Sequence, residues 1–182
     1  NLWLINTHNG IKGVKPRINI NEYSAVKAYL DQHWDKISKR ADKGDTPYNL
    51  RNCAYMEDFY KPKIVWGNLN LSAAYSIAAD GIFVNAPCPM IVPASKYLLA
   101  ILNSKVADYY IRQLGVTRNG GYFEYKPMFV ENLPVPNNID CKTIEYLEAC
   151  VNSKDESSID KLVYNLYKLT DDEIRYIEKG RS

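Results

Sequence analysis

Hydrophobic residues recur at helical spacing in residues 22–40, separated by polar positions. The residues that share one face of such a helix are Val26, Tyr29, Leu30, Trp34 and Ile37. A stripe of this width predicts an amphipathic helix. Residues 43–47, Lys-Gly-Asp-Thr-Pro, follow directly, and their glycine and proline predict that the helix ends there.

A second helical pattern starts at Tyr97. Its apolar positions, most of them on one face, are Leu98, Leu99, Ile101, Leu102, Val106, Tyr109 and Tyr110. Residues 115–121 then form a polar stretch with three glycines and one arginine, and the aromatic run 122–125 follows it. The segment ends on Pro-Val-Pro at 134–136. The order predicts a packed helical region followed by a loop at a contact surface.

Residues 51–92 contain short runs typical of β-strands, bounded by Asn, Asp-Gly or Pro. The runs are 63–66, 74–77, 81–85 and 89–92. The pair Asp80-Gly81 predicts a hairpin turn between the second and third runs. At the start of the chain, residues 2–5 (Leu-Trp-Leu-Ile) are compatible with a short buried strand.

The last part of the chain predicts helices at 143–151, 158–168 and 171–179. Thr170 and Glu173 have the spacing of a capping box before the last one. The middle helix carries an apolar stripe of Ile159, Leu162, Val163, Leu166 and Tyr167. Together the patterns predict an α+β fold: a small curved, mostly antiparallel sheet with a front helix, a central helical hairpin and a C-terminal helical tail. We expect residues 1–137 to form one domain and residues 138–182 to pack on it as the tail.

Composition indicates a folded protein, since 46% of the 182 residues are hydrophobic and 12% aromatic. The net charge is only +2, but its distribution is uneven. Residues 1–66 carry 11 Lys or Arg against 7 Asp or Glu, and residues 138–182 carry 7 against 10. A basic front and an acidic tail are compatible with a surface that binds an anion, and also with scattered solubilising charge.

The cysteines show no C-x-x-C spacing and no pairing with histidine, which argues against a metal site; they are Cys53, Cys88, Cys141 and Cys150. We therefore expect reduced thiols in a cytoplasmic protein. Neither a signal peptide nor a long apolar span is evident, so we expect no membrane contact. Because the sequence starts at Asn1 without methionine, we also expect a fragment of a longer polypeptide.

Three stretches of sequence carry a resemblance to a known family. They are EYSAVKAYLDQHWDK near the start, LLAILNSK followed by GGYFEYKPMFVENLPVP in the middle, and IDKLVYNLYKLTDDEIRYIE at the end. This combination resembles the TaqI-like C-terminal specificity domain of adenine-modifying bacterial DNA methyltransferases and of their type II restriction-modification relatives. The resemblance covers most of the chain.

The resemblance implies a target recognition domain that reads a short double-stranded DNA sequence. It also implies an upstream methyltransferase domain of the same polypeptide, which would use S-adenosylmethionine to methylate adenine N6. The chain has no Asn-Pro-Pro-aromatic motif and no glycine-rich loop after a strand, so it encodes no such cofactor or catalytic site. We therefore expect no cofactor and no catalysis in this chain.

The side chains suited to base edges are Arg118 and Asn119, on the glycine-flanked loop. Lysines suit phosphates, and the resemblance also places Arg51, Lys61 and Lys63 near DNA. The expected DNA contacts are Lys12, Lys15, Arg17, Arg51, Lys61, Lys63, Arg118, Asn119, Gly120, Gly121, Tyr122 and Lys126. Trp66 and Tyr122 fit the core as well as a contact surface, and the two glycines fit a simple tight turn.

Two alternatives remain open at this point. The chain could be a protein–protein docking module of a multisubunit DNA-modifying complex, with its tyrosines on the shared surface. Alternatively, Glu124-Tyr125-Lys126 has the E-x-K spacing of metal-dependent nucleases, which need a second carboxylate to share the metal. The nearby candidate is Asp108, on a predicted helix among apolar neighbours, and E-x-K is common by chance.

Overall fold

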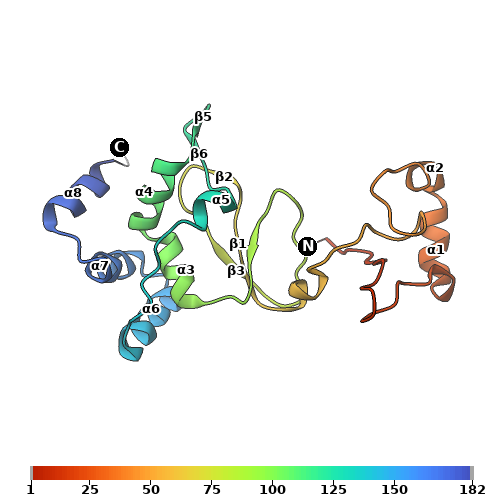
Figure 1. Cartoon of the computed structure of the whole chain (residues 1–182), viewed down its shortest axis with the longest axis horizontal. Helices are drawn as coiled ribbons and strands as arrows, with labels where there is room; N and C mark the ends of the chain where they lie inside the picture. The colour runs from red at the N-terminus through yellow and green to blue at the C-terminus, as the bar shows by residue number, and fades with distance from the viewer. Residues whose placement is uncertain (1, 181–182) are drawn as a thin grey trace. The chain divides into compact units, whose positions relative to one another are not determined.

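The structure is a computed structural model that describes residues 2–180. The chain divides into two compact units, Asn1–Met56 and Glu57–Ser182, called unit 1 and unit 2 below. Figure 1 shows both, with the first in red to orange. The fold is α+β, as the sequence predicts, with eight α-helices and two three-stranded antiparallel sheets among residues 2–180.

Unit 1 contains a 3-10 helix, η1 (Ile20–Glu22), and two short helices, α1 (Ser24–Asp31) and α2 (Trp34–Ile37). The prediction of a single continuous helix over residues 22–40 is therefore wrong, because two short helices occupy this segment. The chain leaves helical geometry at His33, whose φ is −110° and ψ 18°. Neither helix has a buried residue. The sequence predicted an amphipathic face, but it did not show how far that face is buried by the rest of the protein.

The predicted strand at residues 2–5 is also wrong, because these residues form no strand and are all exposed. Unit 1 is instead organised around the buried amide of Asn49. Its Nδ2 donates to the carbonyl oxygens of His8 (3.3 Å) and Ile18 (3.0 Å). One side chain thereby ties the segment before η1 to the segment that follows α2.

Unit 2 contains two small sheets where a single one was expected. The first has the order β3-β1-β4, formed by β1 (Lys63–Val65), β3 (Ser76–Ala78) and β4 (Met90–Ile91). The second has the order β2-β6-β5, formed by β2 (Leu69–Asn70), β5 (Thr117–Arg118) and β6 (Tyr122–Glu124). A 3-10 helix, η2 (Met56–Tyr60), precedes β1.

The hairpin predicted at Asp80-Gly81 is wrong, because residues 81–85 form no strand. Gly81 does turn the chain, with φ +71°, but its N–H donates to the carbonyl oxygen of Phe59 at 2.9 Å. The strand before this turn, β3, pairs with β1, where Ile77 faces Ile64. The turn therefore returns the chain toward η2 and adds no strand.

The central helical hairpin is confirmed as α3 (Lys96–Asn103) and α4 (Lys105–Leu114). Ser104 separates the two helices because its backbone is extended, with φ −69° and ψ 156°. Its hydroxyl accepts from the N–H of Ala107 and donates to the carbonyl oxygen of Ile101, so it caps the second helix and ends the first. A short helix, α5 (Pro127–Val130), follows the second sheet.

The tail forms α6 (Cys141–Ser153), α7 (Glu156–Leu166) and α8 (Asp171–Lys179). The capping box of Thr170 and Glu173 is confirmed. Buried residues of all three helices join one core with α3 and α4: Leu147, Cys150, Ile159, Val163, Tyr164 and Ile177. The domain boundary at 137/138 stays a prediction. None of the helices among residues 2–180 is long and apolar enough to cross a membrane.

Candidate nucleic-acid interface

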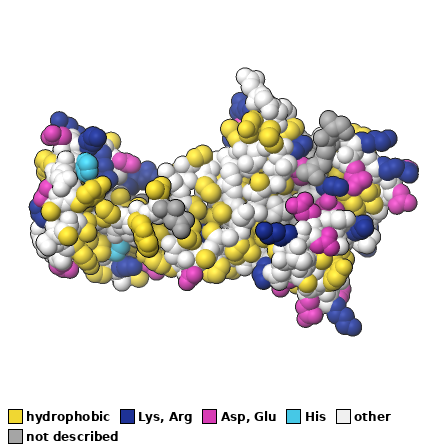
Figure 2. Space-filling model, turned by 180° about the vertical axis from the view of Figure 1, so that it is seen from behind, with side chains coloured by type: hydrophobic (Ala, Val, Ile, Leu, Met, Phe, Trp, Pro, Cys, Tyr) yellow, Lys and Arg dark blue, Asp and Glu magenta, His cyan; other side chains and the backbone are white. Residues whose placement is uncertain are grey.

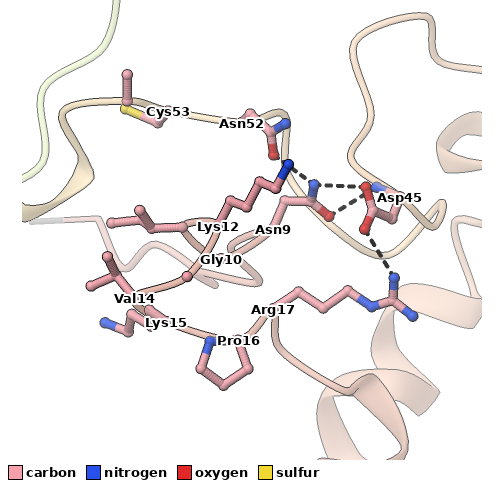
Figure 3. Close-up of a pocket in the computed structure, with 13 residues that line it drawn as sticks. Asn9, Gly10, Lys12, Val14, Lys15, Pro16, Arg17, Asp45, Asn52 and Cys53 are labelled. Atoms are coloured by element: carbon pink, nitrogen blue, oxygen red, sulfur yellow. Dashed lines mark hydrogen bonds and ion pairs between the residues drawn. The ribbon is translucent and has the colours of Figure 1, made fainter.

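The basic loop of unit 1, residues 9–17, surrounds a pocket of about 810 Å³ (Figure 3). The backbone of Ile11 and Lys15 closes the loop, with reciprocal N–H to carbonyl distances of 2.8 and 2.9 Å. Gly10 has φ +77°, and a Cβ there would lie 2.5 Å from the carbonyl oxygen of Lys15. The tight closure therefore requires glycine at this position.

The amide of Asn9 connects the loop to the rest of unit 1 (Figure 3). Its Nδ2 donates to Asp45 Oδ1 at 3.0 Å and to Asn52 Oδ1 at 2.6 Å, and its Oδ1 accepts from the N–H of Asp45 at 2.8 Å. Arg17 Nη1 reaches Asp45 Oδ2 at 3.0 Å. The bonds from Asn9 and then from Arg17 hold the pKa of Asp45 below its usual value. The carboxylate is therefore ionised at neutral pH and fixes Arg17 at the pocket.

The side chains around this pocket have the composition of an anion site. Three are cations, Lys12, Lys15 and Arg17, and Asp45 is the only carboxylate among the lining residues. Lys12 is exposed, and Arg17 keeps 49% of its side chain exposed despite its ion pair. Cations on a closed loop with adjacent amide groups suit the phosphates of a nucleic acid.

Substituting Gly10 tests whether the closed loop forms the pocket. Ala at a φ of +77° costs about 1–2 kcal/mol, and Gly10→Ala adds the contact with Lys15. Gly13→Ala is the matched control, because Gly13 has the same φ and no atom within 4 Å of its Cβ position. We expect Gly10→Ala to lose much more amide hydrogen-exchange protection at Ile11 and Lys15 than Gly13→Ala does. Equal losses would show that the close approach does not exist in solution.

The glycine-flanked stretch of unit 2 forms a β-hairpin of β5 and β6, in which Arg118 lies opposite Tyr122. Gly120 and Gly121 make the turn with φ values of +82° and +78°. Figure 1 shows the hairpin extending beyond the helices of unit 2, and Figure 2 shows it as a narrow projection that carries basic side-chain atoms. Tyr122 is 42% exposed, so the core position considered for it is wrong.

Glu124, the last residue of β6, holds two nearby cations, Arg118 and Lys126. Its side chain is only 4% exposed. Oε1 accepts from Arg118 Nε at 2.7 Å and from Arg118 Nη2, and Oε2 lies 3.0 Å from Lys126 Nζ. These bonds, that of Arg118 first, hold the pKa of Glu124 below its usual value. The carboxylate is therefore ionised at neutral pH, and the three side chains together carry one net positive charge.

The base of β6 is fixed from several directions. The N–H of Tyr125 donates to the carbonyl oxygen of Asn68 at 2.8 Å, and the indole N–H of Trp66 donates to the carbonyl oxygen of Tyr125 at 2.6 Å. Trp66 is 5% exposed, so it is a core residue. The guanidinium of Arg112 lies 4.1 Å from the ring centre of Phe123, a cation–π contact. The projecting hairpin therefore rests on a rigid support.

The structure leaves one expected contact without access to DNA. Lys63 is fully buried in β1, between β3 and β4, and its Nζ donates to the carbonyl oxygen of Ala79 at 2.9 Å. Burial lowers the pKa of this ammonium. We therefore drop Lys63 from the candidate interface. Lys61 and Arg51 are exposed, and Lys61 forms an ion pair with Asp58 at 2.8 Å.

Most of the expected contacts form two groups. Lys12, Lys15 and Arg17 meet at the pocket of unit 1, where Arg51 does not line it. Arg118 and Lys126 meet at Glu124, and Asn119 occupies the adjacent turn. Glu124 was not predicted as the residue that joins the two cations. Its signal was a lone carboxylate placed two residues before one cation and six after the other.

The E-x-K spacing belongs to this ion-pair cluster. The candidate second carboxylate, Asp108, is fully buried and accepts from Tyr125 Oη and from the N–H of Ala73 at 2.7 Å. Among residues 2–180, no group of three His, Cys, Asp or Glu side chains could hold a metal ion. The carboxylate considered as the second ligand is thus engaged within the protein.

Comparison with known families gives a match over most of the chain. The family model of the TaqI-like C-terminal specificity domain matches residues 11–135, which is more than half of the chain. The chain therefore belongs to the TaqI-like C-terminal specificity domain family. The family provides the DNA-recognition module of methyltransferase-type systems and is not itself catalytic. Comparison with curated proteins gives no match.

Proposed function

We propose that this chain is the target recognition domain of an adenine-N6 DNA methyltransferase of a restriction-modification system. Membership of a specificity-domain family is the observation that carries the proposal. The structure supports it with two exposed cationic features, the basic loop of residues 9–17 and the β5–β6 hairpin. Both present side chains of the kinds that contact DNA.

In this proposal the chain contributes binding and no bond-breaking step. Basic side chains attract the duplex and contact its phosphates, and the hairpin contacts base edges. A methyltransferase domain elsewhere in the same polypeptide would bind S-adenosylmethionine and flip the target adenine. The rigid support of β6 would fix how the hairpin meets the duplex, and thereby which adenine is presented.

A second candidate function, protein docking, is favoured by an apolar cleft of about 520 Å³ in unit 2. Its aromatic lining comes from α4, α8 and the residue after α7: Tyr109, Tyr110, Tyr176 and Tyr167. An apolar surface of this kind suits a protein partner. The two functions differ in their salt dependence, since phosphate contacts release counterions and apolar contacts do not.

Binding of the chain to a randomised duplex pool tests the proposal. We expect affinity, measured by fluorescence anisotropy, to fall steeply between about 50 and 200 mM salt. Lys12→Ala/Lys15→Ala should weaken binding and reduce the slope of log K against log salt by about 2, or 1 for each lysine. The control is Lys142→Ala/Lys161→Ala, which removes two exposed charges from the acidic tail. Absence of DNA binding at low salt would count against the proposal and favour protein docking.

A further inference from the structure

We propose that Arg118 reads the major-groove edge of a guanine, and that Glu124 is the positioning residue that orients it. This inference rests on the proposed function and names one base that the domain recognises. It depends on which edge of the guanidinium is occupied. Arg118 Nε and Nη2 both donate to Glu124 Oε1, so the side edge of the guanidinium is used within the protein.

The end edge of the Arg118 guanidinium remains available. It presents two parallel N–H groups, one on Nη1 and one on Nη2. Guanine presents two acceptors, N7 and O6, which match this pair. Adenine offers one acceptor beside an amino donor, thymine offers one acceptor beside a methyl group, and cytosine offers a donor. The geometry therefore selects guanine over the other three bases.

The side chain is held in place before any DNA binds. Glu124 is 4% exposed, whereas Arg118 remains 54% exposed, so the carboxylate is fixed and the arginine faces solvent. Lys126 engages the second oxygen of Glu124 and prevents the carboxylate from turning. A fixed arginine loses less side-chain entropy on binding than a free one. The remaining charge of the cluster is positive, so it does not repel phosphates.

The hairpin that carries Arg118 is two-stranded at its tip, because the pairing of β2 with β6 lies at Phe123 and Glu124. A two-stranded ribbon fits the major groove, which is about 12 Å wide. In the turn, Gly120 and Gly121 add no side chain beside that of Asn119, so the backbone at the glycines can approach the bases closely. Tyr122, opposite Arg118 in register, is exposed beside it. The short reading element is thus one exposed arginine on a thin, projecting ribbon.

Selection of bound sites from a randomised duplex pool tests this assignment. The chain should enrich sites with a guanine at a fixed position, and Arg118→Ala should lose the preference at that position alone. Arg118→Lys should also lose most of it, because one ammonium cannot bridge two acceptors. Arg175→Ala is the matched control, since Arg175 is an exposed arginine in an ion pair on α8. It should leave the selected sites unchanged.

Two further measurements separate positioning from general stability. Replacing that guanine with 7-deazaguanine should weaken binding of the natural chain roughly 5- to 150-fold and leave Arg118→Ala unaffected. Glu124→Gln should reduce the preference for guanine over adenine, with little change in affinity for random DNA. A Glu124→Gln variant that loses both equally would assign Glu124 a purely structural role and overturn its part in the proposal.

The outcomes also distinguish this inference from the function on which it rests. If the natural chain enriches no sequence at low salt, the proposed recognition function fails and the reading of guanine fails with it. If it enriches sites whose every position survives Arg118→Ala, the function stands and the assignment to Arg118 is overturned. Loss of one guanine in the Arg118 variants supports both.

Discussion

Asp108→Ala is expected to destabilise unit 2 by about 3–5 kcal/mol. The carboxylate is fully buried in α4, and it accepts from Tyr125 Oη and from the N–H of Ala73. Arg112 Nε lies 3.2 Å from Asp108 Oδ2 and is itself largely buried. Removing the carboxylate leaves the Tyr125 hydroxyl and the Ala73 amide without this acceptor, and it removes the ion-pair partner of Arg112. Removing one partner of a buried ion pair costs more stability than the intact pair contributes, because the other charge stays buried without compensation.

Urea unfolding of Asp108→Ala beside Glu145→Ala measures this cost, because Glu145 is an exposed acidic residue on α6. We expect the control to remain within about 0.5 kcal/mol of the natural chain. The same variant should also loosen the hairpin, since Arg112 stacks on Phe123 and Tyr125 adjoins Glu124. Equal unfolding midpoints for the two variants would show that the buried network does not form.

The parts of the fold that depend on local pattern could be predicted from the sequence. The helix after Thr170 begins and ends at the predicted residues, and the capping box that starts it is a local signal. The turn at Asp80-Gly81 was also found, but not what it connects. The N–H of Gly81 donates to Phe59, and β3 pairs back to β1. Strand pairing at this distance leaves no mark in a short run of sequence.

The candidate site shows the same division between chemistry and placement. The turn at Gly120 and Gly121 could be predicted, because paired glycines are typical of turns. The position of Arg118 in a strand, where a loop was expected, could not. The sequence could not show that Lys63 is buried whereas Lys126 is accessible. A lysine in a short β-prone run does not reveal whether its strand lies at the centre of a sheet. The strand β1 lies between two others, and this position buries Lys63.

The role of Glu124 in the structure differs from the metal-ligand role that its E-x-K spacing suggested. Its spacing to Lys126 matches that of metal nucleases, which the sequence left as an alternative, whereas in the structure its buried carboxylate holds Lys126 and Arg118. The second cation reaches Glu124 only because β5 folds back along β6, with Thr117 opposite Phe123. Which cations share a carboxylate thus follows from strand register, and register depends on the turn at Gly120 and Gly121.

The second large effect is expected from Leu147→Ala in α6, which should cost unit 2 about 2–5 kcal/mol. Leu147 is fully buried and belongs to the core that also contains Ile101 of α3 and Val163 of α7. The substitution removes several buried methyl groups and leaves a cavity between the tail and the central hairpin. Tyr146→Ala is the control, because Tyr146 precedes Leu147 in α6 and is 55% exposed.

The fluorescence of Trp66 during urea unfolding shows whether this cost reaches the rest of unit 2. Replacing Trp3 and Trp34, both exposed residues of unit 1, with phenylalanine leaves Trp66 as the single reporter. Because Trp66 and Leu147 share one core, we expect Leu147→Ala to shift the Trp66 transition and the helical circular dichroism together. A loss of helical signal at an unchanged Trp66 midpoint would mean that the tail unfolds independently. The boundary at 137/138 would then separate two units that unfold independently. A joint shift would instead mean that the tail and the core beneath the β5–β6 hairpin unfold as one unit.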